Sequence, residues 1–222
     1  MLAGEAVVAI WNGIAPEARA QFYDWHTNEH MPERVGIPGF RRGRRYIAAD
    51  AATQPEYFTL YETDTMQVLQ GSDYGNRLNN PTPGTRSTTA QFCDSARALS
   101  RVLASHGPGM GGLLLTIGFD CDAAHLTALT AVVRDAAALP RITGAHLCMG
   151  DADASAVRTA ETRDRTDIQT PPNVFVMLEA TDAAALASAL TDSALSAAGA
   201  RGPFVRGVYR LEYVRNKTGF AA

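Results

Sequence analysis

The expected strands and helices of this chain occur twice in the same order, and this repeat constrains the fold more than any other feature. In the first half, apolar periodicity and turn signals predict a strand at 5–14, a helix at 16–30, a strand ending near 48, a strand at 57–63, a helix at 64–79 and a strand near 87–93. From Gly112 the same order begins again. The chain therefore encodes two similar α+β units.

Short segments of the first half have counterparts in the second half. Ile142-Thr143-Gly144 stands where Ile37-Pro38-Gly39 stands in the first half, and 174–179 matches 57–62. The spacing between these two markers is longer in the second half, and the additional residues fall in the polar stretch 151–172. We expect this stretch to be a surface loop.

Strand-helix-strand-strand-helix-strand is the order of the ferredoxin-like fold, so the predicted fold class is α+β with two tandem ferredoxin-like repeats. Each repeat has both helices on one face of its sheet, and its strands carry apolar residues on both faces. Packing the two bare faces together predicts an α/β barrel within one chain. The expected boundaries are 1–98 for the first repeat, 99–109 for a connector and 110–222 for the second repeat.

Composition and charge exclude several classes of protein. The net charge of −3 argues against a nucleic-acid-binding surface, and no apolar run reaches the roughly 20 residues of a membrane span. The first residues lack a secretory signal pattern, and the three cysteines form no disulfide framework. Lys217 is the one lysine among many arginines, which is typical of a GC-rich bacterial genome. We expect a bacterial, cytoplasmic protein with a small-molecule substrate, and neither nucleic acid nor a membrane as partner.

The expected helix 16–30 carries an unusual set of polar side chains. On a helical wheel its apolar stripe, which faces the sheet, includes Trp25 and, one turn later, Glu29. A carboxylate on a buried stripe is costly unless it is paired or hydrogen-bonded. His26 lies near the edge of the stripe and His30 follows one turn later, so both imidazoles can reach the same small volume. These three polar residues are the candidate catalytic group.

Three interpretations of this group stay open. It is a structural network in which Glu29 pairs with the histidines, or a zinc site, or a cofactor-free acid/base site. The order His26-x-x-Glu29-His30 matches the inverted zincin pattern H-x-x-E-H, which requires a long helix, whereas this helix is expected to stop at Pro32. An acid/base site needs only the imidazoles, the carboxylate and a small organic substrate. We expect neither a metal nor a cofactor.

Aromatic residues on the first helix and the first-half strands are candidate substrate contacts. They are Trp11, Tyr23, Trp25, Tyr46 and Tyr61. Alternation places Tyr61 on one face of its strand and leaves open which face meets the helix. Arginines at the start of the second strand are expected at a solvated sheet edge, where charge discourages pairing between sheets. They are Arg41, Arg42, Arg44 and Arg45.

The second half lacks the polar group. The positions equivalent to the two histidines and the glutamate are Ala131, Arg134 and Asp135. They lie on a helix whose apolar positions form an ordinary packing face. We expect the second repeat to be the scaffold that completes the barrel, with one site per chain.

Residues 25–34 (WHTNEHMPER) and 37–46 (IPGFRRGRRY) resemble EthD-like members of the dimeric α/β-barrel superfamily. The resemblance implies that His30 is the family's helix-end histidine, with His26 and Glu29 beside it. It also implies a cofactor-independent enzyme of the kind found among the superfamily's monooxygenases, muconolactone isomerases and polyketide cyclases. The superfamily contains haem proteins as well. A typical member is one unit that dimerises, whereas here two units are fused.

Together, sequence and resemblance predict a cofactor-independent acid/base enzyme of isomerase, lyase or monooxygenase type, acting on a small cyclic or aromatic metabolite. His26 or His30 takes a proton, and Glu29 orients that imidazole. The alternative is a non-catalytic small-molecule-binding or structural barrel module, in which Glu29 is buried against His26. A homodimer of the two-repeat chain is compatible with both.

Overall fold

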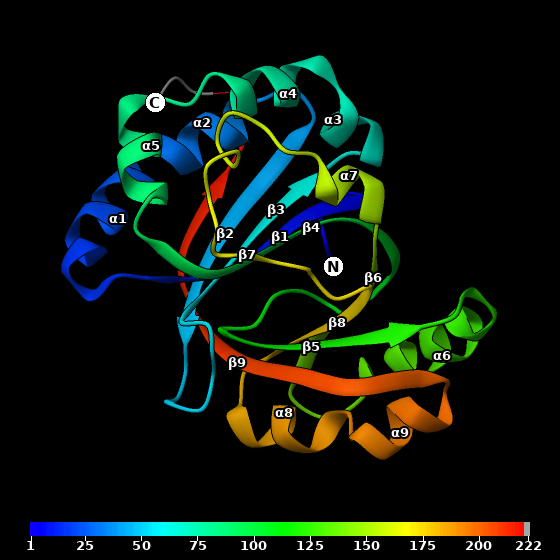
Figure 1. Cartoon of the computed structure of the whole chain (residues 1–222). Coiled ribbons are helices and arrows are strands. Elements are labelled where there is room, and N and C mark those ends of the chain that lie inside the picture. Colours follow the sequence, from blue (N-terminus) through cyan, green and yellow to red (C-terminus); the bar gives the residue numbers. More distant parts are fainter. Residues whose placement is uncertain (220–222) are drawn as a thin grey trace.

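The strands of both halves form one sheet that closes into a barrel (Figure 1). The computed structural model describes residues 1–219. Eight antiparallel strands follow one another in the order β1-β3-β2-β9-β5-β8-β6-β4, and β4 pairs with β1 to close the circle. A short ninth strand, β7, pairs with β4 in parallel. The strands are β1 (Ala6–Ile14), β2 (Phe40–Ala48), β3 (Tyr57–Thr63), β4 (Phe92–His106), β5 (Leu113–Cys121), β6 (Ile142–Gly150), β7 (Ile168–Gln169), β8 (Val174–Ala180) and β9 (Ala200–Asn216). The predicted α+β class and the closed barrel are confirmed.

The closure depends on two long strands, one from each half. β4 has 15 residues and β9 has 17, whereas β1, β2, β5 and β6 have 9 each. The C-terminal part of β4 pairs with β6, and the C-terminal part of β9 pairs with β2. The last strand of each half therefore pairs with a strand of its own half and with a strand of the other half. The strand order within the two halves is the same: β4-β1-β3-β2 and β9-β5-β8-β6.

The helices lie outside the barrel, with those of the first half in the upper part of Figure 1 and α6, α8 and α9 in the lower part. They are α1 (Arg19–Trp25), α2 (Met31–Gly36), α3 (Met66–Gln70), α4 (Ser72–Asn79), α5 (Pro83–Thr89), α6 (Leu126–Ala136), α7 (Ala152–Ala156), α8 (Ala183–Ala189) and α9 (Asp192–Ala197). In the second half the space between helices and strands is filled by apolar side chains, including Leu129, Val133, Leu186 and Leu195. This apolar packing agrees with the expected scaffold role of the second half.

The segment 83–89 is a helix, α5, and not the approach to a strand that the sequence indicated. Thr82 caps the helix, because its side chain accepts a hydrogen bond from the Thr85 amide. The last strand of the first half therefore begins only at Phe92. As a result, most of the expected connector 99–109 lies within β4 and is part of the barrel wall.

Charged side chains lie inside the barrel where the two halves meet. Arg44 of β2 forms ion pairs of 2.9 Å with Glu62 of β3 and of 2.9 Å with Glu179 of β8. Nε2 of His146 on β6 lies 3.2 Å from the same Glu179 carboxylate. All four side chains are almost completely buried. Because buried ions lose their hydration, this mutual pairing, together with the Arg42–Glu62 pair, offsets their cost, and the network links the halves.

The expected solvated arginine edge is wrong for Arg44 and Arg45, which are both buried. β2 is not an edge strand, because it pairs with β3 on one side and with β9 on the other. Successive residues of a strand point to opposite faces, so Arg44 points into the barrel and Arg45 points toward the helices. Arg41 remains exposed and pairs with Asp64.

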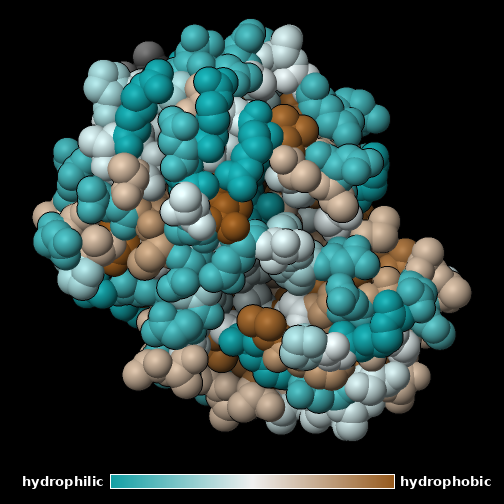
Figure 2. Space-filling view, viewed as in Figure 1, coloured by the Kyte–Doolittle hydropathy of each residue, from teal (hydrophilic) through white to brown (hydrophobic). Residues whose placement is uncertain are grey.

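The face of the molecule in Figure 2 is mostly hydrophilic, with apolar atoms in small separate patches. Large exposed apolar side chains, such as Met110, Leu139 and Val205, are distributed over different elements. The apolar residues of the strands are thus used inside the barrel and beneath the helices. None of the helices within residues 1–219 has the length and apolarity required to cross a bilayer.

Replacing Arg44 by methionine should destabilise the protein by about 3–5 kcal/mol, since it leaves Glu62 and Glu179 buried without their shared cation. Urea unfolding measures this loss. Arg41→Met is the matched control, because it removes an exposed pair and should cost no more than about 1 kcal/mol. Equal losses for the two variants would show that the interior network does not link the halves.

Candidate functional site

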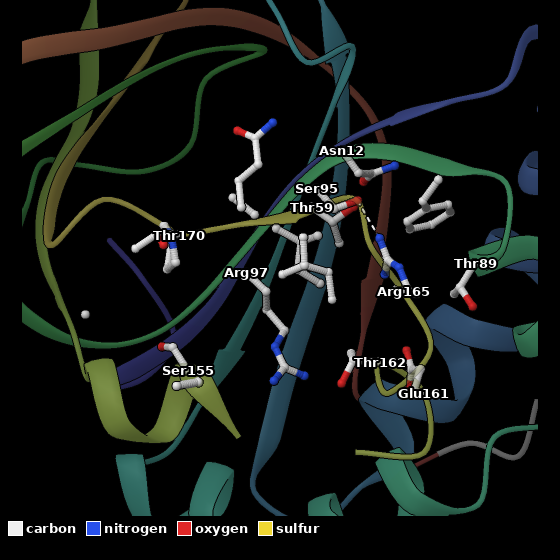
Figure 3. Close-up of a pocket in the computed structure, with 18 of the residues that line it drawn as sticks. Asn12, Thr59, Thr89, Ser95, Arg97, Ser155, Glu161, Thr162, Arg165 and Thr170 are labelled. Carbon is white, nitrogen blue, oxygen red and sulfur yellow. Dashed lines mark hydrogen bonds between the residues drawn. The ribbon is translucent and has the colours of Figure 1, made fainter. Parts of the chain in front are cut away.

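A cavity of about 460 Å³ lies between the strands of the first half and the helical segment that carries the histidines (Figure 3). Its floor is the outward face of β1, β3 and β4, on which Asn12, Thr59 and Ser95 form a polar group. Aromatic side chains give the rest of the wall its apolar character: Phe22, Trp25, Tyr61 and Phe92. This volume is in the range that holds one small organic ligand.

The roof of the cavity comes from the second half of the chain. Residues 151–172, here called the covering loop, contain α7 and β7, and their inner side contributes Ser155, Glu161 and Arg165 to the lining. Arg165 fastens the loop to β4, because its guanidinium lies 2.6 Å from Ser95 Oγ. The loop is at the surface, as predicted, but it also completes the cavity. The second half is therefore more than the scaffold that the sequence indicated.

The helical segment contains one π-helical turn, His26–His30. A π turn inserts one residue relative to α-helical periodicity, so the buried stripe continues from Trp25 to His30 and passes Glu29 by. The helix also does not end at Pro32 as predicted. It continues through this proline as α2, directly after the π turn.

The Glu29 carboxylate is directed toward α5 and does not line the cavity. It accepts a hydrogen bond from the Thr82 hydroxyl, and a Cβ atom at Gly84 would lie only 2.7 Å from its Oε2. Trp25 Nε1 donates to the neighbouring Thr85 hydroxyl at 3.2 Å. These contacts anchor the π turn on α5. The carboxylate therefore pairs with Thr82 and not with the imidazoles, which were its predicted partners.

His26 is held in one protonation form by Arg45. Nη1 of this arginine lies 3.2 Å from His26 Nδ1 and 3.0 Å from the Thr27 hydroxyl. A guanidinium only donates hydrogen bonds, so Nδ1 accepts and the hydrogen of the neutral ring is on Nε2. Burial, together with the charges of Arg45 and Arg34, lowers the pKa of His26 to about 3. His26 therefore offers a neutral N–H donor.

His30 lies beside it, with its ring centroid 5.8 Å from that of His26 and 4.3 Å from that of Trp25. Burial and the nearby Arg34 hold the pKa of His30 well below its usual range. Its Nδ1 is buried without a hydrogen-bond partner among residues 1–219, and so is the hydroxyl of Tyr61. An unpaired buried polar atom costs about 1–3 kcal/mol.

Two arginines behind the imidazoles give this wall a positive character. Arg45 is partly neutralised by Glu212, at 3.2 Å, and Arg34 by Glu161 of the covering loop, at 2.5 Å. Both still act on the histidines, since each contributes to the low pKa of His26. Neutral imidazoles between cations favour an anion in the cavity and lower the pKa of an acidic group bound there.

The histidines are poorly arranged to hold a metal ion. Nδ1 of His26 faces Arg45 and its Nε2 carries a hydrogen, so neither nitrogen offers a free lone pair. Histidine ligands normally donate their second N–H to a carboxylate or a carbonyl, whereas His26 accepts from a cation. Glu29 points toward α5, so the three residues of the zinc pattern do not converge. Within residues 1–219 no group of three His, Cys, Asp or Glu side chains could hold a metal.

Four of the eight residues predicted for the site line the cavity: Trp25, His26, His30 and Tyr61. Tyr23 lies outside it, behind the imidazoles. Its hydroxyl lies 3.1 Å from Glu212 Oε1, and its ring lies 4.7 Å from the Arg45 guanidinium. Tyr23 therefore supports Arg45 from behind.

Trp11 and Tyr46 do not contact this cavity, because they point to the inside of the barrel. On β1 the residues that face the cavity are Ile10 and Asn12, and Trp11 between them takes the opposite face. Trp11 borders a second cavity of about 340 Å³ at the barrel mouth, next to Tyr209. The expectation that these two aromatic residues share a pocket with the histidines is therefore wrong.

Sequence reasoning missed Arg45 and the covering loop. Alternation along the predicted strand separates Arg45 from Arg44 and points the two to opposite faces, but it could not show that this strand pairs on both sides. The signal for the covering loop was the longer spacing in the second half. It showed where the residues are inserted but not which half they cover.

No protein-family model and no curated protein matches the chain. Solved structures match over nearly its whole length. An anthrone oxidase-like protein has a TM-score of 0.61 and 12% identity, covering 95% of this chain and 92% of that one. A candidate monooxygenase from Fusobacterium nucleatum subsp. nucleatum has a TM-score of 0.56 and 8% identity, and the match covers 99% of this chain and 98% of that one. A haem-binding protein from Thermus thermophilus has a TM-score of 0.50 and 12% identity, and the match covers 93% of this chain and 91% of that one. Because none of the three identities exceeds 12%, this likeness establishes the fold alone.

The stability of the protein should decrease as the pH falls below about 6.5. The unfolded chain takes up a proton at His26 near its ordinary value of 6.5, whereas the folded protein does so only near 3. The stabilisation is therefore complete above the unfolded value, and His26 alone removes about 1.4 kcal/mol per pH unit on the way down. Unfolding measurements at several pH values should show a weaker dependence for His26→Gln.

The control for this measurement is His125→Gln, which replaces an exposed histidine at the start of α6. It should leave the pH dependence as it is in the wild type. If His26→Gln behaved in the same way as this control, His26 would not be held neutral by burial and Arg45.

Proposed function

We propose that the chain is an enzyme that acts on a small cyclic or aromatic metabolite by acid/base chemistry without a cofactor. The observation that carries the proposal is the pair of neutral imidazoles on the wall of an aromatic-lined cavity. His26 offers an N–H donor fixed by Arg45, and the ring of His30 lines the same cavity. Groups of this kind serve a substrate better than they serve a folded core.

In this proposal His30 accepts a proton from an acidic C–H or O–H group of the substrate. The resulting anion is stabilised by Nε2–H of His26 and by the charges of Arg34 and Arg45. A low imidazole pKa does not prevent the transfer, because the new anion supplies the opposite charge that burial and the arginines withhold. Glu29 takes no direct part and anchors the π turn.

The fate of the anion defines the reaction type. Return of the proton at another position is isomerisation, loss of a leaving group is elimination, and reaction with dioxygen is oxygenation. The name of the anthrone oxidase-like structure favours oxygenation of an electron-rich aromatic ring among these three. The aromatic side chains of the cavity, Phe22, Trp25 and Phe92, suit such a planar substrate.

We infer that the barrel derives from two fused ferredoxin-like units and that the chain is an EthD-like member of the dimeric α/β-barrel superfamily. Support comes from the identical strand orders of the halves and from the motif at residues 25–46. In a member with one unit per chain, two chains are needed to close the barrel. Here one chain closes it, so a homodimer of this chain would use a different surface.

Haem, which one similar structure binds by name, fits these residues poorly. A proximal histidine needs a free lone pair and an acceptor for its second N–H. His26 has neither, and Nδ1 of His30 has no acceptor among the described residues. In the second half the corresponding space is filled by Leu129, Val133 and their neighbours. The proposal therefore involves no step at haem.

The test is turnover of a panel of hydroxyanthrones, hydroxynaphthoquinols and small lactones, followed by absorbance and oxygen uptake. His30→Gln should lower kcat by about 10²–10⁴-fold, because it removes the base. His26→Leu should lower it by about 10²–10³-fold, because it removes a donor to the anion. Circular dichroism checks that each variant remains folded.

Glu29→Gln is the matched control, since it alters the same helix on the side away from the cavity. It should lose about 1 kcal/mol of stability at the contact with Thr82 and keep its turnover within a few-fold. If Glu29→Gln lost as much turnover as His30→Gln, the proposed division of roles would be refuted.

A non-catalytic small-molecule-binding module is the second candidate. The observation that favours it is that Arg45 and Glu29 both use their charge to fix the helix, as structural residues do. Such a module would show an increase in melting temperature with aromatic ligands, but no product with any member of the panel. The enzyme should show both.

A further inference from the structure

Arg97 brings a positive charge into the cavity from the strand side. It follows Ser95 by two residues on β4, so both side chains point outward from the barrel. In Figure 3 its side chain leaves β4 and extends into the cavity toward the level of Ser155 and Thr162 in the covering loop. The residue is half-buried there. Partial burial strengthens the interaction of its guanidinium with any charge nearby.

The groups that hold Arg97 in place are neutral. Nη2 lies 3.4 Å from the carbonyl oxygen of Val157, and the guanidinium also interacts with the hydroxyl of Tyr74 on α4. These contacts fix the direction of the side chain without neutralising its charge. A guanidinium has five N–H donors in a planar fork, so donors remain for a further acceptor.

The other charged side chains of the lining are already compensated or exposed. Arg165 pairs with Asp167 at 2.6 Å, and Glu161 pairs with Arg34. Arg158 is exposed and donates to carbonyl oxygens of its own loop. Asp120, also exposed, lies opposite Arg201 in the strand register. Among the described lining residues, Arg97 is the half-buried cation for which no carboxylate partner is seen.

We propose that Arg97 binds a carboxylate on the substrate, so that the preferred ligand is an aromatic carboxylic acid with its ring between the aromatic walls. A carboxylate matches the planar fork of a guanidinium, and such a charge-assisted pair is stronger than a neutral hydrogen bond. The carboxylate is held from β4, and the reacting part of the ring faces the histidines of the π turn. This inference rests on the proposed function, since it assumes an aromatic ligand in this cavity.

Binding of two probes tests the inference: 1-hydroxy-2-naphthoate and its methyl ester, which differ in the charge of one group. Fluorescence titration or calorimetry at pH 7.5 gives the two dissociation constants. The wild type should bind the acid about 10–100-fold more tightly than the ester. In Arg97→Gln this preference should disappear, with the ester bound as before. Arg97→Lys keeps a charge without the fork and should retain part of the preference.

Arg101→Gln is the matched control. Arg101 lies four residues further along β4, is exposed, and does not line the cavity. The preference for the acid should be unchanged in this variant. If Arg97→Gln did not fold, Arg97→Lys would be compared with Arg101→Gln. The inference is overturned if both variants keep the full preference for the acid, or if both lose it to the same extent.

The two proposals can fail separately. Equal affinity of the wild type for acid and ester, or a preference that survives Arg97→Gln, overturns the role of Arg97 while leaving the histidine chemistry in place. Conversely, a preference that depends on Arg97 together with full turnover in His30→Gln supports the inference and overturns the proposed function. If neither probe binds while turnover of neutral substrates depends on His30, the inference also fails.

Discussion

The pairing of β4 with β6 and of β9 with β2 is the constraint on which the rest of the structure depends. It closes the sheet, removes its edges and assigns each strand residue to the inside or the outside of the barrel. The inside is filled by an apolar core and by the ion pairs of Arg44. The cavity that the histidines line is on an outer face, beneath the helices.

The two outer faces have different contents although their strands have the same order. Beneath α6, α8 and α9 the face is packed with apolar side chains, whereas beneath the π turn there is a cavity. The same pairing explains how the second half covers it. Gly150, at the end of β6, lies opposite Ser100 of β4, so the chain that continues from β6 emerges beside the first half's sheet. The covering loop begins there and closes over the site.

The sequence predicted the parts of this structure that follow from periodicity and repetition. The element order, the closed barrel, the exposed insertion and the pair of histidines at the cavity were accessible, because apolar patterns report which residues are buried. The π turn was not, since a wheel drawn at 100° per residue cannot reveal an inserted residue, and this error placed Glu29 in the site. The burial of Arg45 was not accessible either, because it depends on β9, a strand more than 150 residues away in the sequence.

The central claim is that burial and Arg45 hold His26 as a neutral imidazole with its hydrogen on Nε2, ready to stabilise a substrate anion. Nitrogen-15 NMR of the histidine side chains between pH 5 and 8 measures this directly, because the two ring nitrogens have different shifts in each form. Our account predicts, for His26, an unprotonated Nδ1 and a protonated Nε2 whose shifts stay constant over this range. A titration of His26 with a midpoint near 6.5, or a hydrogen on Nδ1, would contradict it.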